Sequence, residues 1–321
     1  MSIVSTDEFA RLTEELRSGA EARAGGTDTM ARLRAGLDAG PFADLGGLEE
    51  LRGVAWGPNG GARIGALTTV ADVAADPVLG AAYPALTATA RALATPQIRN
   101  AATLGGNLLQ RNRCWYFRNP EFSCHQDGGD SCPARAGDHR GGVAFDTSPC
   151  AAPHASSLAV ALLAYDARAE TADGRSDPVQ RPLRELYDAA DGTRDHVLEP
   201  GEVLGVIELP APEPGETAAY VRATARSRAE WPLVEAVARV VREDGGSGRV
   251  ARVAVAAGAV ARTPLRLGEV ESALEGAPAD PSEAAKAVEG LPGQCSPLPG
   301  TRYKTTLLRD TVRDALERAL A

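Results

Sequence analysis

The chain has 321 residues, of which 43 are acidic and 34 are basic, so its formal charge is -9. That length predicts about two domains, and a composition of 44% hydrophobic and 24% charged residues is typical of a globular protein rather than a disordered one. The acidic balance offers no positive field to nucleic-acid phosphates. No apolar stretch reaches the roughly 18 residues of a membrane span.

The N-terminal segment carries acidic residues where a signal peptide carries basic ones, and it has no apolar core. We therefore expect a cytoplasmic protein. Phe9, Leu12 and Leu16 recur at helical spacing, and Ser5 with Glu8 forms a capping box. The sequence thus predicts an amphipathic helix at this end.

A small α/β lobe is expected to end near residue 55, and a larger lobe is expected to end in the proline-rich stretch at 210–216. The elements expected in the small lobe are strands at 21–24 and 42–45 around a helix at 27–37. The elements expected in the larger lobe are a strand at 62–69, helices at 77–94 and 157–163, and strands at 167–171 and 203–209.

Beyond residue 216 the pattern predicts two strands, at 231–242 and 249–260, joined by the flexible turn EDGGSG. The helices expected after them cover 265–274, 281–288 and 301–320. The last third of the chain is therefore predicted to be a sheet backed by helices.

Two glycine turns are candidate anion-binding sites. In the first, Ala24–Asp28, two glycines let the backbone approach a ligand closely, and successive amides can point at one anion. The second lies within 97–107 and flanks Gly105 and Gly106 with hydroxyl, amide and guanidinium groups. The first matches neither the dinucleotide fingerprint nor a P-loop, and a double glycine before a helix is more often just a turn. The second is also consistent with a helix stop followed by a polar turn. Together they favour a dinucleotide with a diphosphate.

Four cysteines cluster in a segment, 112–153, that is too polar and too long to be an ordinary loop. They are Cys114, Cys124, Cys132 and Cys150, whereas Cys295 stands alone. Four thiolates can close one metal site, but the spacing matches neither the paired ligands of zinc ribbons nor the common ferredoxin runs. Zinc, an iron–sulfur cluster and unconnected reduced thiols all stay open.

The sequence gives no sign of a hydrolase. Its four histidines lack the spacing of a catalytic zinc helix, and there is no G-x-S-x-G elbow. Arg226, Arg228 and Trp231 lie together beside a predicted strand, where an exposed charged edge is as good an interpretation as a ligand contact. We therefore expect no catalytic acid–base pair.

The glycine turns resemble a known flavoprotein pattern. AGGTD at 24–28 and NAATLGGNLLQ at 100–110 resemble, in order and separation, the two flavin-diphosphate loops of the FAD-binding medium subunit of the molybdenum hydroxylases, the xanthine dehydrogenase and aldehyde oxidoreductase family. The resemblance covers nearly the whole chain. It implies an α/β (α+β) fold with a two-lobed PCMH-type FAD-binding domain at 1–212 (lobes 1–55 and 56–212) and, at 213–321, a C-terminal antiparallel sheet with helices like that of the CO dehydrogenase flavoproteins.

The Cys-rich segment adds a second resemblance. RNRCWYF at 111–117, with the three cysteines that follow it, is similar to an insertion in the bacterial, periplasmic-type aldehyde oxidoreductase flavin subunit. The resemblance implies a 4Fe-4S cluster on Cys114, Cys124, Cys132 and Cys150. The flavin subunit of 4-hydroxybenzoyl-CoA reductase has such an insertion too, so the cluster does not fix the substrate class.

The resemblance also implies which residues bind the flavin. GEVLGVIELP at 201–210 resembles the strand beside the isoalloxazine ring, and Arg222 stands where relatives carry a basic residue. Ser157 replaces a carboxylate that touches the flavin in relatives. The full implied set is Arg23, Ala24, Gly25, Gly26, Thr27, Asp28, Thr29, Met30, Thr103, Gly105, Gly106, Asn107, Ser157, Leu204 and Arg222.

The implied function is electron transfer within a heterotrimer or its dimer. Electrons would come from a large molybdenum subunit through a small 2Fe-2S subunit to FAD on this chain, and then pass to an external acceptor, with an aldehyde or N-heterocycle as organic substrate. Export of the complex on a partner's signal is the alternative to a cytoplasmic location. The rival functions are a stand-alone flavin-dependent oxidoreductase and a zinc-stabilised binding module without flavin.

Overall fold

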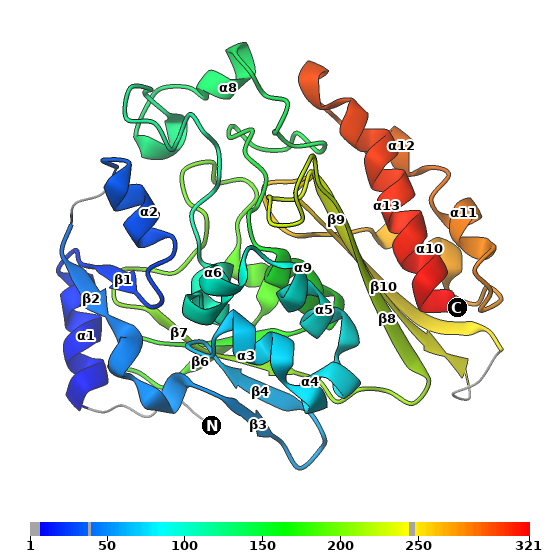
Figure 1. The fold of residues 1–321 in the computed structure, drawn as a ribbon, viewed down its shortest axis with the longest axis horizontal. Coiled ribbons are helices and arrows are strands. Elements are labelled where there is room, and N and C mark those ends of the chain that lie inside the picture. The colour runs from blue at the N-terminus through cyan, green and yellow to red at the C-terminus, as the bar shows by residue number, and fades with distance from the viewer. Residues whose placement is uncertain (1–6, 38–39, 244–247) are drawn as a thin grey trace.

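The computed structural model describes residues 7–37, 40–243 and 248–321. The fold is mixed α/β, as predicted, and it has three parts: a small N-terminal unit, a central five-stranded sheet with helices, and a C-terminal four-stranded sheet with helices (Figure 1). The two larger sheets are antiparallel throughout.

The N-terminal unit packs onto the central sheet. It contains α1 (Asp7–Arg17), β1 (Glu21–Arg23), α2 (Thr29–Arg34) and β2 (Phe42–Asp44). β1 and β2 pair in parallel. The predicted amphipathic helix is confirmed, because α1 buries Phe9, Leu12 and Leu16 in a cluster that also includes Val203 and Val206 of the central sheet. Ser5 of the expected capping box lies outside the described residues.

The central part has the strand order β3-β4-β7-β5-β6. Its strands are β3 (Val54–Trp56), β4 (Ala62–Gly65), β5 (Arg168–Ala172), β6 (Val179–Pro182) and β7 (Val203–Leu209). Its helices are α3 (Val70–Ala75), α4 (Pro77–Ala82), α5 (Pro84–Ala92), α6 (Pro96–Ala101), α7 (Leu104–Leu108) and α9 (Ser157–Ala164). Every residue of α9 is buried, and this helix contacts β9 and β10 of the C-terminal sheet, so it forms the joint between the two larger parts.

The C-terminal part has the strand order β11-β10-β9-β8. Its strands are β8 (Glu216–Ala223), β9 (Val234–Arg242), β10 (Val250–Gly258) and β11 (Leu265–Arg266). Its helices are α10 (Gly268–Leu274), α11 (Glu283–Ala287), α12 (Leu291–Gln294) and α13 (Tyr303–Leu320). The predicted sheet backed by helices is present, with α13 packed on β8 and β9. The expected turn EDGGSG lies mostly outside the described residues.

Two predicted helices differ from the structure, and strand β8 is absent from the prediction. The single helix expected at 77–94 is two helices, because Pro84 lacks an amide proton and Tyr83 takes φ -134° and ψ 65°. The helix expected from residue 265 begins at Gly268, since Leu265 and Arg266 pair with β10 as a short strand. β8 was not expected at all. It is an edge strand whose residues are all half-buried, so it lacks the alternation that marks a strand.

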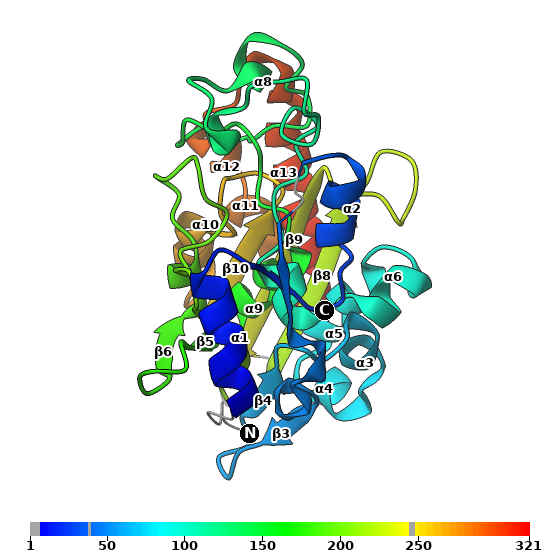
Figure 2. The same cartoon turned by 90° about the vertical axis from the view of Figure 1, so that its left-hand side faces the viewer.

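The Cys-rich segment at 112–153 contains little regular structure. Its only helices among the described residues are α8 (Pro133–Ala136) and a 3-10 turn at His125–Asp127. The segment lies over one end of the molecule, between α2 and the start of α13 (Figures 1 and 2). It therefore reaches both the N-terminal unit and the C-terminal part.

Candidate functional site: a cavity between two glycine loops

A cavity of about 660 Å³ separates the N-terminal unit from the central sheet. Both predicted glycine turns line it, the first with residues 24–29 and the second with Thr103, Gly105 and Gly106. Leu204 of β7 lines it as well, as the resemblance implies. Its volume falls within the range of about 300–1,000 Å³ that is usual for sites of small ligands and cofactors.

Close backbone packing makes glycine necessary in both loops. A Cβ on Gly25 would lie 1.7 Å from the carbonyl oxygen of Ala101, which belongs to the second loop. A Cβ on Gly105 would lie 2.8 Å from the Cβ of Ala66. The first contact shows that the two loops touch each other. Their pairing in the sequence analysis agrees with this arrangement.

The two loops do not offer their amides equally. Gly26 has φ +68°, the left-handed conformation that favours glycine, and the structure shows no acceptor among its described residues for the amides of Gly25 and Gly26. The Gly105 amide, by contrast, donates to the carbonyl oxygen of Ala66 at 2.8 Å, and the Gly106 amide donates to Oγ1 of Thr103 at 3.1 Å. The second loop therefore provides space for an anion, and the first provides the free donors.

A second cavity, of about 170 Å³, continues from the first. The residues that border both are Thr27, Asp28, Gly106 and Gln110. The second cavity is also bordered by Asn107, Arg222 and Trp231. The glycine loops thus lie in the middle of an elongated space, which suits a dinucleotide whose diphosphate joins two bulky ends.

Other residues of the implied set lie farther from the cavities. Arg23 pairs with Asp44 of β2, and neither Arg23 nor Met30 lines either cavity. Arg222 borders the smaller cavity, although its guanidinium donates to the carbonyl oxygens of Ala92 and Glu230.

Ser157 lies away from both cavities. It is fully buried at the start of α9, beside Glu235 and Tyr220. Tyr220 donates to Oε2 of Glu235 at 2.7 Å, and burial raises the pKa of that carboxyl group. In this structure Ser157 is thus part of the joint between the two larger parts.

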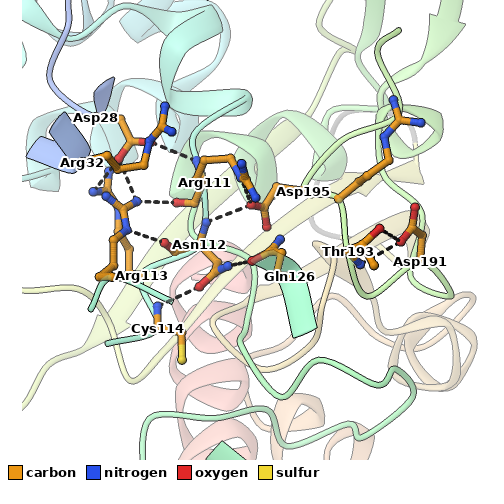
Figure 3. Close-up of polar contacts among 12 residues, drawn as sticks. Asp28, Arg32, Arg111, Asn112, Arg113, Cys114, Gln126, Asp191, Thr193 and Asp195 are labelled. Carbon is orange, nitrogen blue, oxygen red and sulfur yellow. Dashed lines mark hydrogen bonds and ion pairs between the residues drawn. The ribbon is translucent and has the colours of Figure 1, made fainter. Parts of the chain in front are cut away.

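A polar network beside the first loop was not anticipated from the sequence (Figure 3). Asp28 accepts from the backbone amide of Arg111 at 3.1 Å, and Asp195 accepts from Nε of Arg111 at 2.8 Å. Asp195 also forms an ion pair with Arg262 at 2.7 Å. Burial alone would raise the pKa of the Asp195 carboxyl, but the charges of Arg262 and Arg111 outweigh it and lower the pKa to about 2. This carboxylate is therefore ionised and fixed at neutral pH.

The loop that leads into β7 also lines the large cavity. Its residues 201–204 belong to the segment that the resemblance implies beside the flavin, whereas Arg194, His196 and residues 198–200 were not predicted. The only local signal for it was the turn at Pro200 and Gly201, where Gly201 has φ +91°.

The four clustered thiols belong to the Cys-rich segment and lie near one another. Burial raises the pKa of Cys124, and the thiols of Cys114 and Cys132 raise it further. Burial likewise raises the pKa of Cys150 to about 11, with smaller contributions from Cys132 and Cys114. Throughout the described ranges, no three His, Cys, Asp or Glu side chains are close enough together to hold one metal ion.

Among the described residues, no helix is both long enough and apolar enough to cross a membrane.

Comparison with known proteins agrees with this geometry. Residues 1–212 match the family described as the FAD binding domain in molybdopterin dehydrogenase, and residues 219–319 match the CO dehydrogenase flavoprotein C-terminal domain. The chain is similar to the aldehyde oxidoreductase FAD-binding subunit PaoB of Escherichia coli (strain K12). The two are 32% identical over 326 residues, which cover 99% of this chain and 97% of that protein.

Two solved structures share the fold. Carbon monoxide dehydrogenase from Hydrogenophaga pseudoflava matches with a TM-score of 0.75 at 22% identity, covering 97% of this chain and 93% of that chain. Quinoline 2-oxidoreductase from Pseudomonas putida 86 matches with a TM-score of 0.73 at 20% identity, covering 97% and 93%. From the domain matches and the full-length relative, the chain belongs to the family of FAD-binding oxidoreductase subunits built on the FAD binding domain of molybdopterin dehydrogenases.

Proposed function

We propose that this chain is the FAD-binding electron-transfer subunit of a molybdenum-dependent hydroxylase. It would accept electrons from a large molybdenum subunit through a small 2Fe-2S subunit and pass them to an external acceptor. FAD, when bound, supplies the redox chemistry, and the protein supplies position and electrostatics. The observation that carries the proposal is the meeting of two glycine loops, from distant parts of the chain, at the middle of one elongated cavity.

Different residues of the chain would bind different parts of FAD. The free amides of Gly25 and Gly26 would donate to the diphosphate, because its negative charge needs donors that have no other acceptor. Gly105 and Gly106 keep the opposite wall free of side chains. The smaller cavity, with Arg222 and Trp231 on its border, would take one end of the cofactor, and the larger cavity beside Leu204 would take the other.

A 4Fe-4S cluster on Cys114, Cys124, Cys132 and Cys150 is part of the proposal. Its support is the mutual proximity of the four thiols, two of which are buried, together with the similarity of RNRCWYF to the insertion of related flavin subunits. The choice of a 4Fe-4S cluster over zinc rests on that similarity, because neither the paired ligands of zinc ribbons nor the common ferredoxin runs match the spacing of these cysteines along the chain. A cluster beside the flavin cavity would serve as an electron relay.

The substrate class follows the relatives. The name of the E. coli relative points to an aldehyde, and the fold is also that of an enzyme named for an N-heterocycle. The flavin subunit of an enzyme like 4-hydroxybenzoyl-CoA reductase is a second candidate, because its Cys-rich insertion is similar. A stand-alone flavin oxidoreductase is a third, although the sequence contains no motif for acid–base chemistry on a substrate.

The relay assignment is tested by adding partners. The chain is purified alone with its cofactors, and flavin reduction is followed anaerobically with an aldehyde or an N-heterocycle, before and after the molybdenum and 2Fe-2S subunits are supplied. We expect reduction only in the complete mixture. Rapid reduction by the organic substrate without partners would instead establish a stand-alone flavin enzyme.

A further inference from the structure

Asp28 connects the first glycine loop to the Cys-rich segment. It occupies the N-cap position of α2, yet its carboxylate does not cap that helix. Instead Oδ1 pairs with Arg113 and Arg118, both at 2.8 Å, and Oδ2 accepts from the Arg111 amide. The side chain is only 13% exposed. Charge-assisted hydrogen bonds of this kind are among the strongest that a protein makes, so this loop and residues 111–118 are held as one unit.

Asn112 extends the connection to the cysteines (Figure 3). This side chain is buried, and its Oδ1 accepts from the backbone amide of Cys114 at 2.8 Å. Its Nδ2 donates to Gln126, two residues after Cys124, and its backbone amide donates to Oδ2 of Asp195 at 3.2 Å. A change in the position of residues 111–113 would therefore displace the peptide groups that place two of the four thiols.

Arg118 holds the connection from the other side. Its Nε donates to the carbonyl oxygen of Asn112 at 2.9 Å, and its guanidinium also donates to the carbonyl oxygen of Arg111 at 3.0 Å. Arg118 lines neither of the two cavities beside the glycine loops. It therefore links Asp28 to residues 111–113 without forming part of the flavin site.

We propose that Asp28 and Arg118 are positioning residues that couple occupancy of the FAD site to the order of the Cys-rich segment. The inference rests on the proposed function, because it requires FAD to bind between the glycine loops. One face of the short loop at 25–28 offers amides to the cofactor, while the carboxylate of its last residue holds the segment that carries the thiols. Coupling between two sites is reciprocal. Ordering of the Cys-rich segment therefore tightens FAD binding by the same factor by which FAD favours the ordered segment.

The test is hydrogen–deuterium exchange of the backbone amides at 112–153, measured on the full chain with and without saturating FAD. For wild type we expect FAD to slow exchange about tenfold, which lies within the usual range of coupling between sites. Arg118→Gln should still bind FAD, as measured by quenching of flavin fluorescence, but FAD should no longer slow the exchange. Asp28→Asn removes the charge of the other partner in the Asp28–Arg118 ion pair. In this variant, too, FAD should no longer slow the exchange.

The matched control is Arg135→Gln. Arg135 forms ion pairs with Asp146 inside the same segment and does not contact the glycine loop. This variant should exchange faster than wild type in both conditions, yet it should keep the full effect of FAD. A general loosening of the segment is thereby separated from a loss of coupling.

The outcomes distinguish the inference from the proposed function. FAD binding to wild type without any protection of 112–153 would overturn the coupling and leave the FAD site standing. Full protection in both Arg118→Gln and Asp28→Asn would overturn the roles of these two residues. Failure of wild type to bind FAD at all would overturn the proposed function and the coupling together.

Discussion

The glycine loops and the Cys-rich segment meet at Asp28, but different forces hold them in place. The loops are fixed by short-range packing of backbone on backbone, in which even one methyl group on Gly25 would collide with Ala101. The Cys-rich segment has almost no regular structure, and polar contacts anchor it from several directions. Examples are Lys304 donating to the carbonyl oxygen of Gly141, and the Gly300 amide donating to His139.

This difference determines what each region can tolerate. A single added atom is enough to break the close backbone packing of the loops, and the damage stays local. A network of polar contacts fails when a buried partner is removed, because the remaining group has lost its solvation, and the failure spreads through residues that are distant in sequence. Substitutions that affect only one of the two regions therefore test whether the comparison holds.

The largest expected effect is on the thiol side. Changing any one of Cys114, Cys124, Cys132 or Cys150 to Ser should remove most of the iron from anaerobically purified protein and expose the segment to protease, since metal binding is coupled to folding. Cys295→Ser is the control, because this cysteine lies apart and its Sγ donates to the carbonyl oxygen of Leu291. Stoichiometric zinc without iron in the wild-type protein would defeat the cluster.

The next effect is on the glycine side. Gly25→Ala places a Cβ against a backbone oxygen, and relief of such crowding costs about 1–3 kcal/mol, which corresponds to about a 5- to 150-fold loss of FAD affinity. The affinity is measured by titration with quenching of flavin fluorescence. Gly268→Ala, where no atom lies within 4 Å of the added Cβ, should bind FAD like wild type. Unchanged binding by Gly25→Ala would mean that the loops do not need to touch.

A smaller effect concerns His154, which directly follows the Cys-rich segment. Its Nδ1 accepts from the Ser156 amide at 3.2 Å, and burial lowers its pKa to about 3 from the ordinary 6.5. Below pH 6.5 the unfolded chain takes up a proton at this residue and the folded protein does not. The free energy of unfolding should therefore fall as the pH drops, by about 1 kcal/mol between pH 6.5 and pH 5.5, and at lower pH by about 1.4 kcal/mol per pH unit.

Denaturant unfolding at pH 6.5 and pH 5.5 measures this slope. His154→Gln keeps an acceptor for Ser156 but cannot take up the proton, so its free energy of unfolding should depend less steeply on pH between these two values. An identical slope in the variant and in wild type would show that His154 is not the group responsible.

The sequence predicted the features that depend on neighbouring residues. The apolar spacing of Phe9, Leu12 and Leu16 was sufficient for α1, and the two double glycines marked the loops that meet at the cavity. The network around Asp28 could not be predicted in this way. Its partners Arg111 and Arg118 lie 83 and 90 residues away along the chain, and no local spacing connects them.

Edge strands were the other failure. β8 is half-buried along its whole length, between α5 and α13, and so shows no alternation of apolar and polar residues. β6 lies at the end of its sheet, where its first two residues are exposed and its last two are half-buried. In both strands, neighbouring helices or solvent at the edge of the sheet determine which residues are buried. The sequence of the strand itself does not show this.

The central claim is that this chain holds FAD between its glycine loops, and the absorption spectrum of the purified chain tests it most directly. We predict one noncovalent FAD per chain, released as intact FAD by denaturation, and a smaller amount of bound FAD in Gly25→Ala. A colourless wild-type protein that neither retains FAD nor quenches the fluorescence of added FAD would contradict the account.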